Sequence, residues 1–170
     1  MEDTAIRPAR EEDTVRVQEL RKRGWQDSYV NDETGVTKEL LVTQIAKLPV
    51  PKSDIEHYHK MLAKPENQNK NLVAIIGDKI IGTVFYDMLE NGNGDIGVFV
   101  DSKYRGQGIG TKLLRELIMR TPTSLEVTIF AKNKSRELYK KCGFKEVGLE
   151  QKHYFTEGVY LPIQRLVLAR

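Results

Sequence analysis

A glycine-rich turn between an apolar run and a helical pattern most constrains how this chain can fold. The apolar run ends in Val98-Phe99-Val100, the turn is Arg105-Gly106-Gln107-Gly108-Ile109-Gly110-Thr111, and the helical pattern starts near Lys112. Glycines let a backbone approach an anion without a Cβ in the way, and the N–H groups of a helix N-terminus add partial positive charge. The pattern therefore predicts a strand, an anion-binding loop and a helix in direct succession.

Two other phosphate-binding motifs fit this chain poorly. A P-loop needs a lysine directly after its second glycine, but Gly110 is followed by Thr111. A literal G-x-G-x-x-G runs from Gly92 to Gly97, yet it leads into a second strand-like run and not into a helix. We interpret that segment as a hairpin turn, because its Asn and Gly residues tolerate positive φ.

The spacing of Arg105, Gly108 and Gly110 directly after a strand resembles the acyl-CoA pyrophosphate loop of the GCN5-related N-acetyltransferase (GNAT) family. Downstream, Ser135-Arg136-Glu137-Leu138-Tyr139-Lys140-Lys141-Cys142-Gly143-Phe144 resembles the second signature of that family, small-x-x-Leu-Tyr-x-Lys-x-Gly-Phe. The resemblance covers the central half of the chain, from the strand before Asp101 to Phe144.

Hydrophobic periodicity gives an order of elements that is compatible with this resemblance. Strands are predicted at 4–7, 72–76, 80–89, 95–100, 125–130, 144–155 and 160–168, and helices after 13, from 37 to 48, from a Ser53/Glu56 capping box, at 108–120 and at 133–141, with a loop at 64–70. We expect one domain over residues 1–170, an α/β fold whose mixed, mainly antiparallel central sheet has helices on both faces. The GNAT acyl-CoA N-acyltransferase fold is of this kind, and the resemblance implies that strand 95–100 splays from strand 125–130 with the pantetheine arm in the gap.

Composition limits the classes of protein to which the chain can belong. The 170 residues include one cysteine, Cys142, which excludes an intramolecular disulfide, and no apolar run is long enough to span a membrane. The N-terminus has no basic region followed by an apolar one, so we expect a cytoplasmic protein. Basic residues concentrate between Asp101 and Lys145, where a polyanionic cofactor explains them better than nucleic acid, and solvated helix faces account for most of them.

The resemblance implies acetyl-CoA as the cosubstrate and assigns a set of residues to it. These are Val98, Phe99, Val100, Arg105, Gly106, Gln107, Gly108, Ile109, Gly110, Thr111, Asn133 and Tyr139. Asn133 stands one position after the place where the family often carries an asparagine. A backbone N–H in the region Phe99 to Val100 is the expected donor to the oxyanion of the reaction.

Two residues are candidates for proton transfer. The family motif places Tyr139 close to the sulfur of CoA, where a phenol can protonate the departing thiolate; the alternative is that Tyr139 packs on the sheet and only binds cofactor. Asp95 stands where many relatives carry a glutamate and is the candidate base, although an aspartate beside a turn is often only a turn residue. Strand alternation puts Asp95, Gly97 and Phe99 on one face and the residues between them on the other.

Aromatic residues suggest walls for an acceptor site. Trp25 and Tyr29 are four apart, a spacing that puts both on one side of a helix, and the alternative is that they are core aromatics. His153 and Tyr154 are candidates for the opposite wall. We expect no metal site, because His57 and His59 face differently on a helix, and we expect Cys142 to be a buried filler.

The leading hypothesis is an acetyl-CoA-dependent N-acetyltransferase that moves an acetyl group to a primary amine, that of a small molecule, by direct transfer in a ternary complex. One alternative is a protein lysine or N-terminal acetyltransferase, and another is a non-catalytic acyl-CoA-binding module. We expect no nucleic-acid or membrane partner, and a homodimer stays open.

Overall fold

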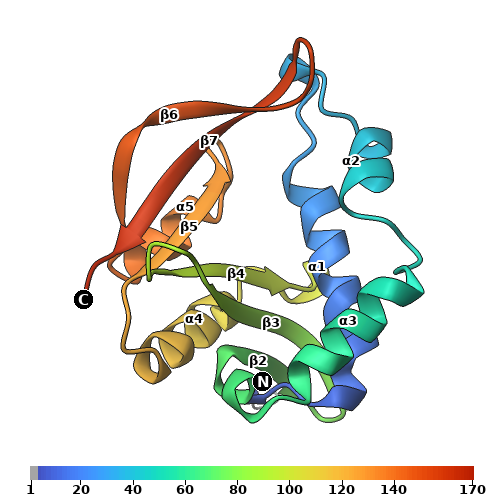
Figure 1. Cartoon of the computed structure of the whole chain (residues 1–170), viewed down its shortest axis with the longest axis vertical. Coiled ribbons are helices and arrows are strands. Elements are labelled where there is room, and N and C mark those ends of the chain that lie inside the picture. The colour runs from blue at the N-terminus through green and yellow to red at the C-terminus, as the bar shows by residue number, and fades with distance from the viewer. Residues whose placement is uncertain (1–3) are drawn as a thin grey trace.

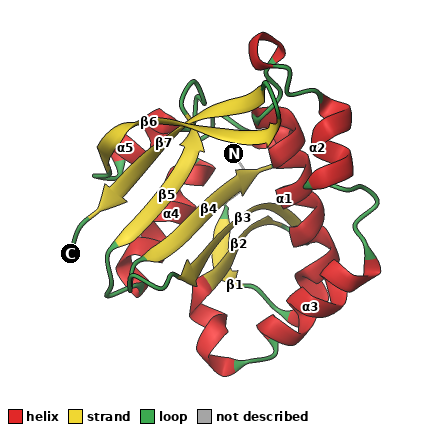
Figure 2. Ribbon diagram, turned by 45° about the horizontal axis from the view of Figure 1, so that its top comes forward, coloured by secondary structure: helices red, strands yellow, loops and turns green. Residues whose placement is uncertain are grey.

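The computed structural model describes residues 4–170 and contains a seven-stranded sheet in the order β1-β2-β3-β4-β5-β7-β6 (Figure 2). The strands are β1 (Ala5–Pro8), β2 (Asn71–Ile76), β3 (Lys79–Met88), β4 (Gly94–Val100), β5 (Leu125–Phe130), β6 (Lys145–Thr156) and β7 (Val159–Leu168). The helices are α1 (Thr14–Ser28), α2 (Lys38–Gln44), α3 (Lys52–Leu62), α4 (Ile109–Arg120) and α5 (Arg136–Lys141), with short 3-10 turns η1 (Glu11–Asp13), η2 (Asp32–Thr34), η3 (Pro65–Lys70) and η4 (Ser102–Tyr104).

The sheet divides at the pairing of β4 with β5. Every other pair of neighbouring strands is antiparallel, whereas β4 and β5 run parallel and pair only at Gly94 with Leu125 and at Asp95 with Glu126. Beyond these two positions the strands diverge, as Figure 1 shows. The predicted splay is confirmed, and it leaves one edge of β4 without a partner strand.

Helices cover both faces of the sheet, as expected. On one face, α4 and α5 bury Leu113, Leu117 and Tyr139 against β2 to β5. On the opposite face, α1 and α3 bury Val17 and Tyr58 against the other side of the first strands. The mixed α/β fold class is therefore confirmed, and each face of β4 is covered by a different helix.

The second predicted helix ends earlier than periodicity indicated. The α2 helix stops at Gln44 instead of continuing to 48. The side chains of Lys22 and Gln26 on α1 donate to the carbonyl oxygens of Ile45 and Ala46, at 3.0 and 2.8 Å. These tertiary hydrogen bonds satisfy the carbonyls at the helix end, and a local pattern does not contain them.

Other boundaries also differ from the prediction. The expected capping box at Ser53 was wrong, because α3 begins at Lys52 with Pro51 at the N-cap. The last helix begins at Arg136 and not at Asn133, whose side chain accepts a hydrogen bond from the Ser135 N–H (2.9 Å) in a turn before it. The loop expected at 64–70 is largely the 3-10 turn η3. No helix among residues 4–170 is long and apolar enough to cross a membrane.

Candidate active site

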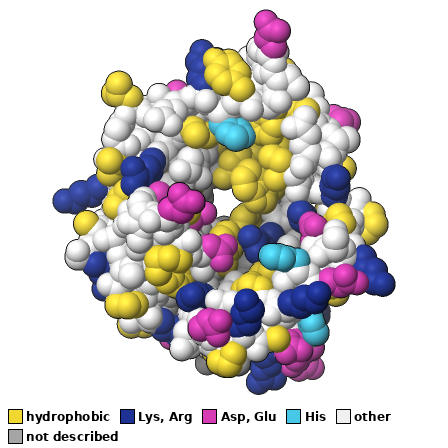
Figure 3. Space-filling view, in the orientation of Figure 1, with side chains coloured by type: hydrophobic (Ala, Val, Ile, Leu, Met, Phe, Trp, Pro, Cys, Tyr) yellow, Lys and Arg dark blue, Asp and Glu magenta, His cyan; other side chains and the backbone are white. Residues whose placement is uncertain are grey.

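A cavity of about 610 Å³ lies where β4 and β5 separate. It is bounded by α1 on one side and by the β6–β7 hairpin on another, and Figure 3 shows the hollow with hydrophobic side chains on one rim and acidic and basic ones on another. Its lining includes Arg21, Trp25, Tyr29, Phe85, Asp87, Asp95, Gly97, Val98, Phe99, Glu126, Asn133, Ser135, Tyr139, His153, Phe155, Leu161 and Ile163.

A row of three carboxylates crosses the floor of this cavity. Asp87 on β3 is paired in register with Asp95 on β4, which is paired with Glu126 on β5, so the three side chains share one face. Burial, followed by the charges of Asp87 and Glu126, raises the pKa of Asp95 to about 6. Such a carboxylate is ionised at neutral pH and accepts a proton more readily than an ordinary aspartate.

Glu126 differs from Asp95 although both belong to the same row. Burial opposes its ionisation, but hydrogen bonds from Asn93 and Arg165, both at 2.7 Å, lower its pKa overall. Glu126 is therefore a paired structural charge with a lowered pKa, whereas the pKa of Asp95 is raised.

Tyr139 places its ring in the main core and its hydroxyl at the cavity. The residue is 3% exposed, and burial, followed by the proximity of Tyr29, raises its pKa, which the Val98 N–H lowers in part. Burial and the charge of Asp95 also raise the pKa of Tyr29, to about 12. Both phenols are thus protonated at neutral pH, and both lie close enough to Asp95 to respond to its charge.

Trp25 and Tyr29 lie on one side of α1, as their spacing predicted. The rings of Trp25 and Tyr29 stack at a centroid distance of 4.3 Å, and both line the cavity. Gly24 of α1 lies against the ring of Phe99, so α1 approaches β4 closely on this face. Ile96, by contrast, is part of the core under α4, which confirms the predicted alternation of β4.

Alternation also determines which backbone donors face the gap. The Asp101 N–H donates to the Ile81 carbonyl of β3 (2.8 Å), so the Phe99 N–H, two residues earlier, points to β3 as well. The N–H groups of Val98 and Val100 therefore face the side that β5 leaves unpaired. Within the expected donor region, the Val100 N–H therefore faces the gap, whereas the Phe99 N–H points to β3 and the Phe99 ring lines the cavity.

The glycine-rich turn has the features of an anion-binding loop. Gly106 and Gly108 both have φ of +79°, a left-handed conformation that favours glycine, and open space surrounds both positions. Within the described chain, the backbone N–H groups from Gly106 to Thr111 have no backbone acceptor. Position 110 favours glycine for a different reason. The α4 helix packs closely on α5 there, and a Cβ on residue 110 would lie 2.8 Å from the side chain of Leu138.

Arg105 makes contacts that the sequence did not indicate. Its Nε donates to the Val100 carbonyl (2.9 Å), and its Nη2 pairs with the carboxylate of Asp27 on α1 (2.8 Å). Arg105 thus joins the end of β4 to the last turn of α1, at the edge of the loop. Of the residues outside the loop that were assigned to the cofactor, Val98, Phe99, Asn133 and Tyr139 line the cavity.

The structure separates the two hairpin residues that were predicted to form an acceptor wall. His153 lines the cavity, whereas Tyr154 is 57% exposed and lies outside it, beside Tyr160. Successive side chains of a strand point to opposite faces, so Phe155 takes the inward position. Arg21, Phe85 and Phe155 are lining residues that the sequence analysis missed, and strand alternation could have found Phe155.

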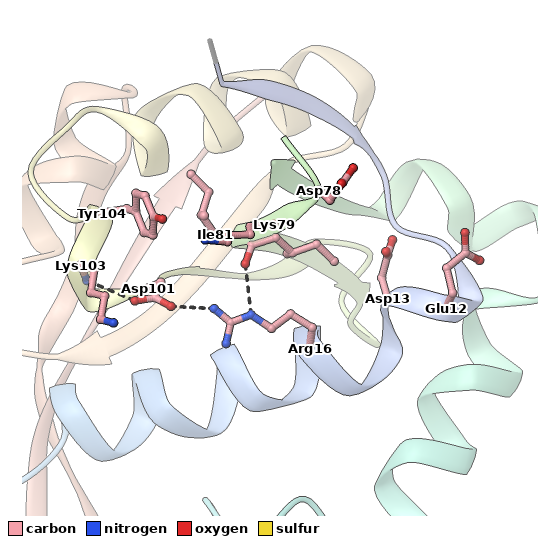
Figure 4. Close-up of a pocket in the computed structure, with 10 residues that line it drawn as sticks. Glu12, Asp13, Arg16, Asp78, Lys79, Ile81, Asp101, Lys103 and Tyr104 are labelled. Carbon is pink, nitrogen blue, oxygen red and sulfur yellow. Dashed lines mark hydrogen bonds and ion pairs between the residues drawn. The ribbon is translucent and has the colours of Figure 1, made fainter. Parts of the chain in front are cut away.

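A second hollow, of about 540 Å³, lies at the start of α1 and contains mostly charged side chains (Figure 4). Arg16 donates to Asp101 (2.6 Å) and to the Ile80 carbonyl (3.1 Å), and Asp13 is paired with Arg7 at 2.6 Å. Its less exposed charges are therefore paired, whereas Asp78, Lys79 and Lys103, which form no ion pair among the described residues, are exposed. Among the described residues no group of His, Cys, Asp and Glu side chains is arranged to hold a metal ion.

Comparison with known proteins decides the family. Residues 67–146 match the model of the acetyltransferase (GNAT) domain, a segment that includes β4, the glycine-rich turn and Tyr139. This segment of the chain is a GNAT domain. The GNAT motifs thus lie at the gap between β4 and β5 and along the loop that follows β4.

One relative by sequence and two proteins of similar structure extend the comparison. The chain is 30% identical over 102 residues to the L-amino acid N-acetyltransferase AaaT of Escherichia coli K12, covering 54% of this chain and 63% of that protein. A ribosomal-protein-alanine N-acetyltransferase from Brucella melitensis has a similar structure (TM-score 0.70, 25% identity, 98% of this chain and 99% of that one). A GNAT superfamily phosphinothricin acetyltransferase from Sinorhizobium meliloti, crystallised with acetyl-CoA, shares the fold (TM-score 0.72, 20% identity, 99% and 88%).

Proposed function

We propose that this GNAT protein is an acetyl-CoA-dependent N-acetyltransferase that acetylates a primary amine of a small molecule by direct transfer. The observation that carries the proposal is the meeting of Asp95, Tyr139 and the unpaired edge of β4 in one cavity. The loop from Gly106 to Thr111, with its unused N–H groups, suits the pyrophosphate of the cosubstrate. Relatives named for L-amino acids and for phosphinothricin support a small acceptor.

Each step of the transfer has a candidate group. Acetyl-CoA supplies the acetyl thioester. A primary amine has a pKa of about 10 and arrives protonated, so Asp95 accepts a proton from it before the nitrogen attacks the thioester carbon. The Val100 N–H, which faces the gap, stabilises the oxyanion. As the carbon–sulfur bond breaks, Tyr139 protonates the thiolate and regains a proton that the nitrogen loses.

The second candidate acceptor is the N-terminal amine of a protein. The fold similarity to the Brucella melitensis enzyme over nearly the whole chain favours it. Side chains of the β6–β7 hairpin, including His153 and Phe155, line one wall of the cavity and narrow the space above Asp95. A walled cavity suits a small molecule better than an extended peptide, and we therefore rank the protein acceptor second.

Thiol release from acetyl-CoA, measured across small amines, amino acids and N-terminal peptides, tests the proposal. We expect Tyr139→Phe to lower kcat about a hundredfold, because it removes the proton donor, while the Kd for CoA from calorimetry stays nearly constant. Tyr154→Phe, in the same fold but outside the cavity, should change neither. Equal loss of turnover and CoA affinity would reduce Tyr139 to a binding role, and no release with any amine would refute the transferase.

A further inference from the structure

We propose that Arg21 of α1 anchors a carboxylate of the acceptor, which makes the acceptor an α-amino acid or a similar zwitterion. The inference rests on the proposed acetyl transfer for its chemistry. It identifies a specificity-determining residue on the wall of the cavity that neither family motif contains.

The guanidinium of Arg21 is held in place by aromatic contacts. It lies 4.0 Å from the centroid of the Phe85 ring and 5.5 Å from that of Tyr58. The Tyr58 hydroxyl donates to Asn71 (2.9 Å) and is therefore fixed in turn. Stacking orients the planar guanidinium and leaves most of its N–H donors in its own plane free for another partner.

Arg21 also lacks the carboxylate partner that its neighbours have. On the same helix, Arg16 pairs with Asp101 (2.6 Å) and Lys22 pairs with Asp54 (2.9 Å). Arg21 is half-buried, lines the cavity and forms no ion pair with any residue in the described range. Charged groups removed from water are normally paired, and the fork of a guanidinium matches a carboxylate in a bidentate arrangement.

The carboxylates on the cavity floor complete a site for a zwitterion. Phe85, under Arg21, is two residues from Asp87 along β3, and Asp87 is paired with Asp95. The charge of Arg21 reaches Asp95 and favours its ionised form. An α-amino acid carries its nitrogen and its carboxylate on one carbon, so one end can meet Asp95 while the other meets Arg21. An acceptor with a second ammonium group in place of the carboxylate would be repelled by Arg21.

The test compares leucine with leucinamide, which keeps the amine and the side chain but lacks the carboxylate. We expect the wild-type protein to favour leucine by about tenfold to a hundredfold in kcat/KM, the range for charge-assisted hydrogen bonds. Arg21→Gln should remove most of this preference by acting on leucine alone, and Arg21→Lys should restore part of it. The matched control is Arg23→Gln, which removes the same charge from an exposed position outside the cavity and should keep the preference.

Binding is measured separately from turnover through the fluorescence of Trp25, the only tryptophan of the chain, which lines the cavity. Titrations of both compounds in the presence of CoA should show the same preference for leucine and the same loss in Arg21→Gln. Equal binding of the two compounds, equal losses for both in Arg21→Gln, or a preference for diamines would overturn the inference. A binding preference without any thiol release would support the anchor and refute the proposed transferase.

Discussion

The two hollows of this molecule are similar in volume and differ in the state of their charges. The hollow at the start of α1 measures about 540 Å³, and its Arg16 and Asp13 are paired with Asp101 and Arg7. The cavity at the splay measures about 610 Å³ and contains an aspartate with a raised pKa and an arginine that forms no ion pair within residues 4–170. The difference teaches that unpaired charge at partly buried positions, and not volume, distinguishes a candidate site from a surface depression, where the unpaired charges are exposed.

The largest expected effect is that of Asp95→Asn in the cavity. We expect kcat/KM to fall about a thousandfold, because a positioned base contributes between about a hundredfold and ten-thousandfold. In the wild-type protein kcat/KM should rise with pH through about 6 as Asp95 loses its proton, and the variant should lack this limb. Rates measured from pH 5 to pH 8 with one amine check both points.

Stability provides the control for that variant. The folded pKa of Asp95 is raised, so its contribution is fully present below its unfolded pKa and is lost as pH rises through about 6. Asp95→Asn should therefore be more stable than the wild type at pH 8, by about 1 kcal/mol for a half-buried group, and the difference should vanish near pH 4. A variant that loses activity together with stability at pH 8 would contradict this account.

The elements that surround the two hollows differ in how accurately the sequence predicted them. The α4 helix was predicted within one residue because its apolar period and its glycine N-cap are local features. The β4 alternation, and with it the shared face of Asp95 and Phe99, followed from the same kind of pattern. The end of α2 did not, because side chains of α1 terminate it.

Two contacts that the sequence analysis missed, those of Arg21 and of Arg105, share one physical cause. Arg21 reaches the cavity only because α1 crosses the face of β3 and stacks it on Phe85. The pairing of Arg105 with Asp27 likewise joins residues far apart in the chain. Such contacts depend on how helices are placed against the sheet, and a single sequence carries no pattern for them.

A smaller effect is expected at the loop, where Asp27 holds Arg105. Asp27→Asn removes a negative charge beside an anion-binding turn and frees the guanidinium, so we expect CoA to bind about twofold to fivefold more tightly at low ionic strength. The gain should shrink in high salt and should be absent when Arg105→Gln is also present. Calorimetry with the two single variants and the double variant checks this, and weaker CoA binding in Asp27→Asn would instead make the ion pair a support for the loop.

The smallest effect on activity is expected in the second hollow. Arg16→Gln removes the ion pair with Asp101 and should lower the free energy of unfolding by about 1 kcal/mol, as for a partly exposed pair, while kcat/KM stays within about twofold. Burial opposes ionisation of Asp101, but the Arg16 hydrogen bond lowers its pKa overall, so the stability difference should be present at pH 7 and disappear as the pH falls below about 4. Arg23→Gln, with the same change of charge at an exposed position of α1, is the control for both measurements. A loss of turnover in Arg16→Gln without a loss of stability would show that the second hollow also serves the reaction. In that case the contrast between paired and unpaired charge would no longer distinguish the second hollow from the cavity at the splay.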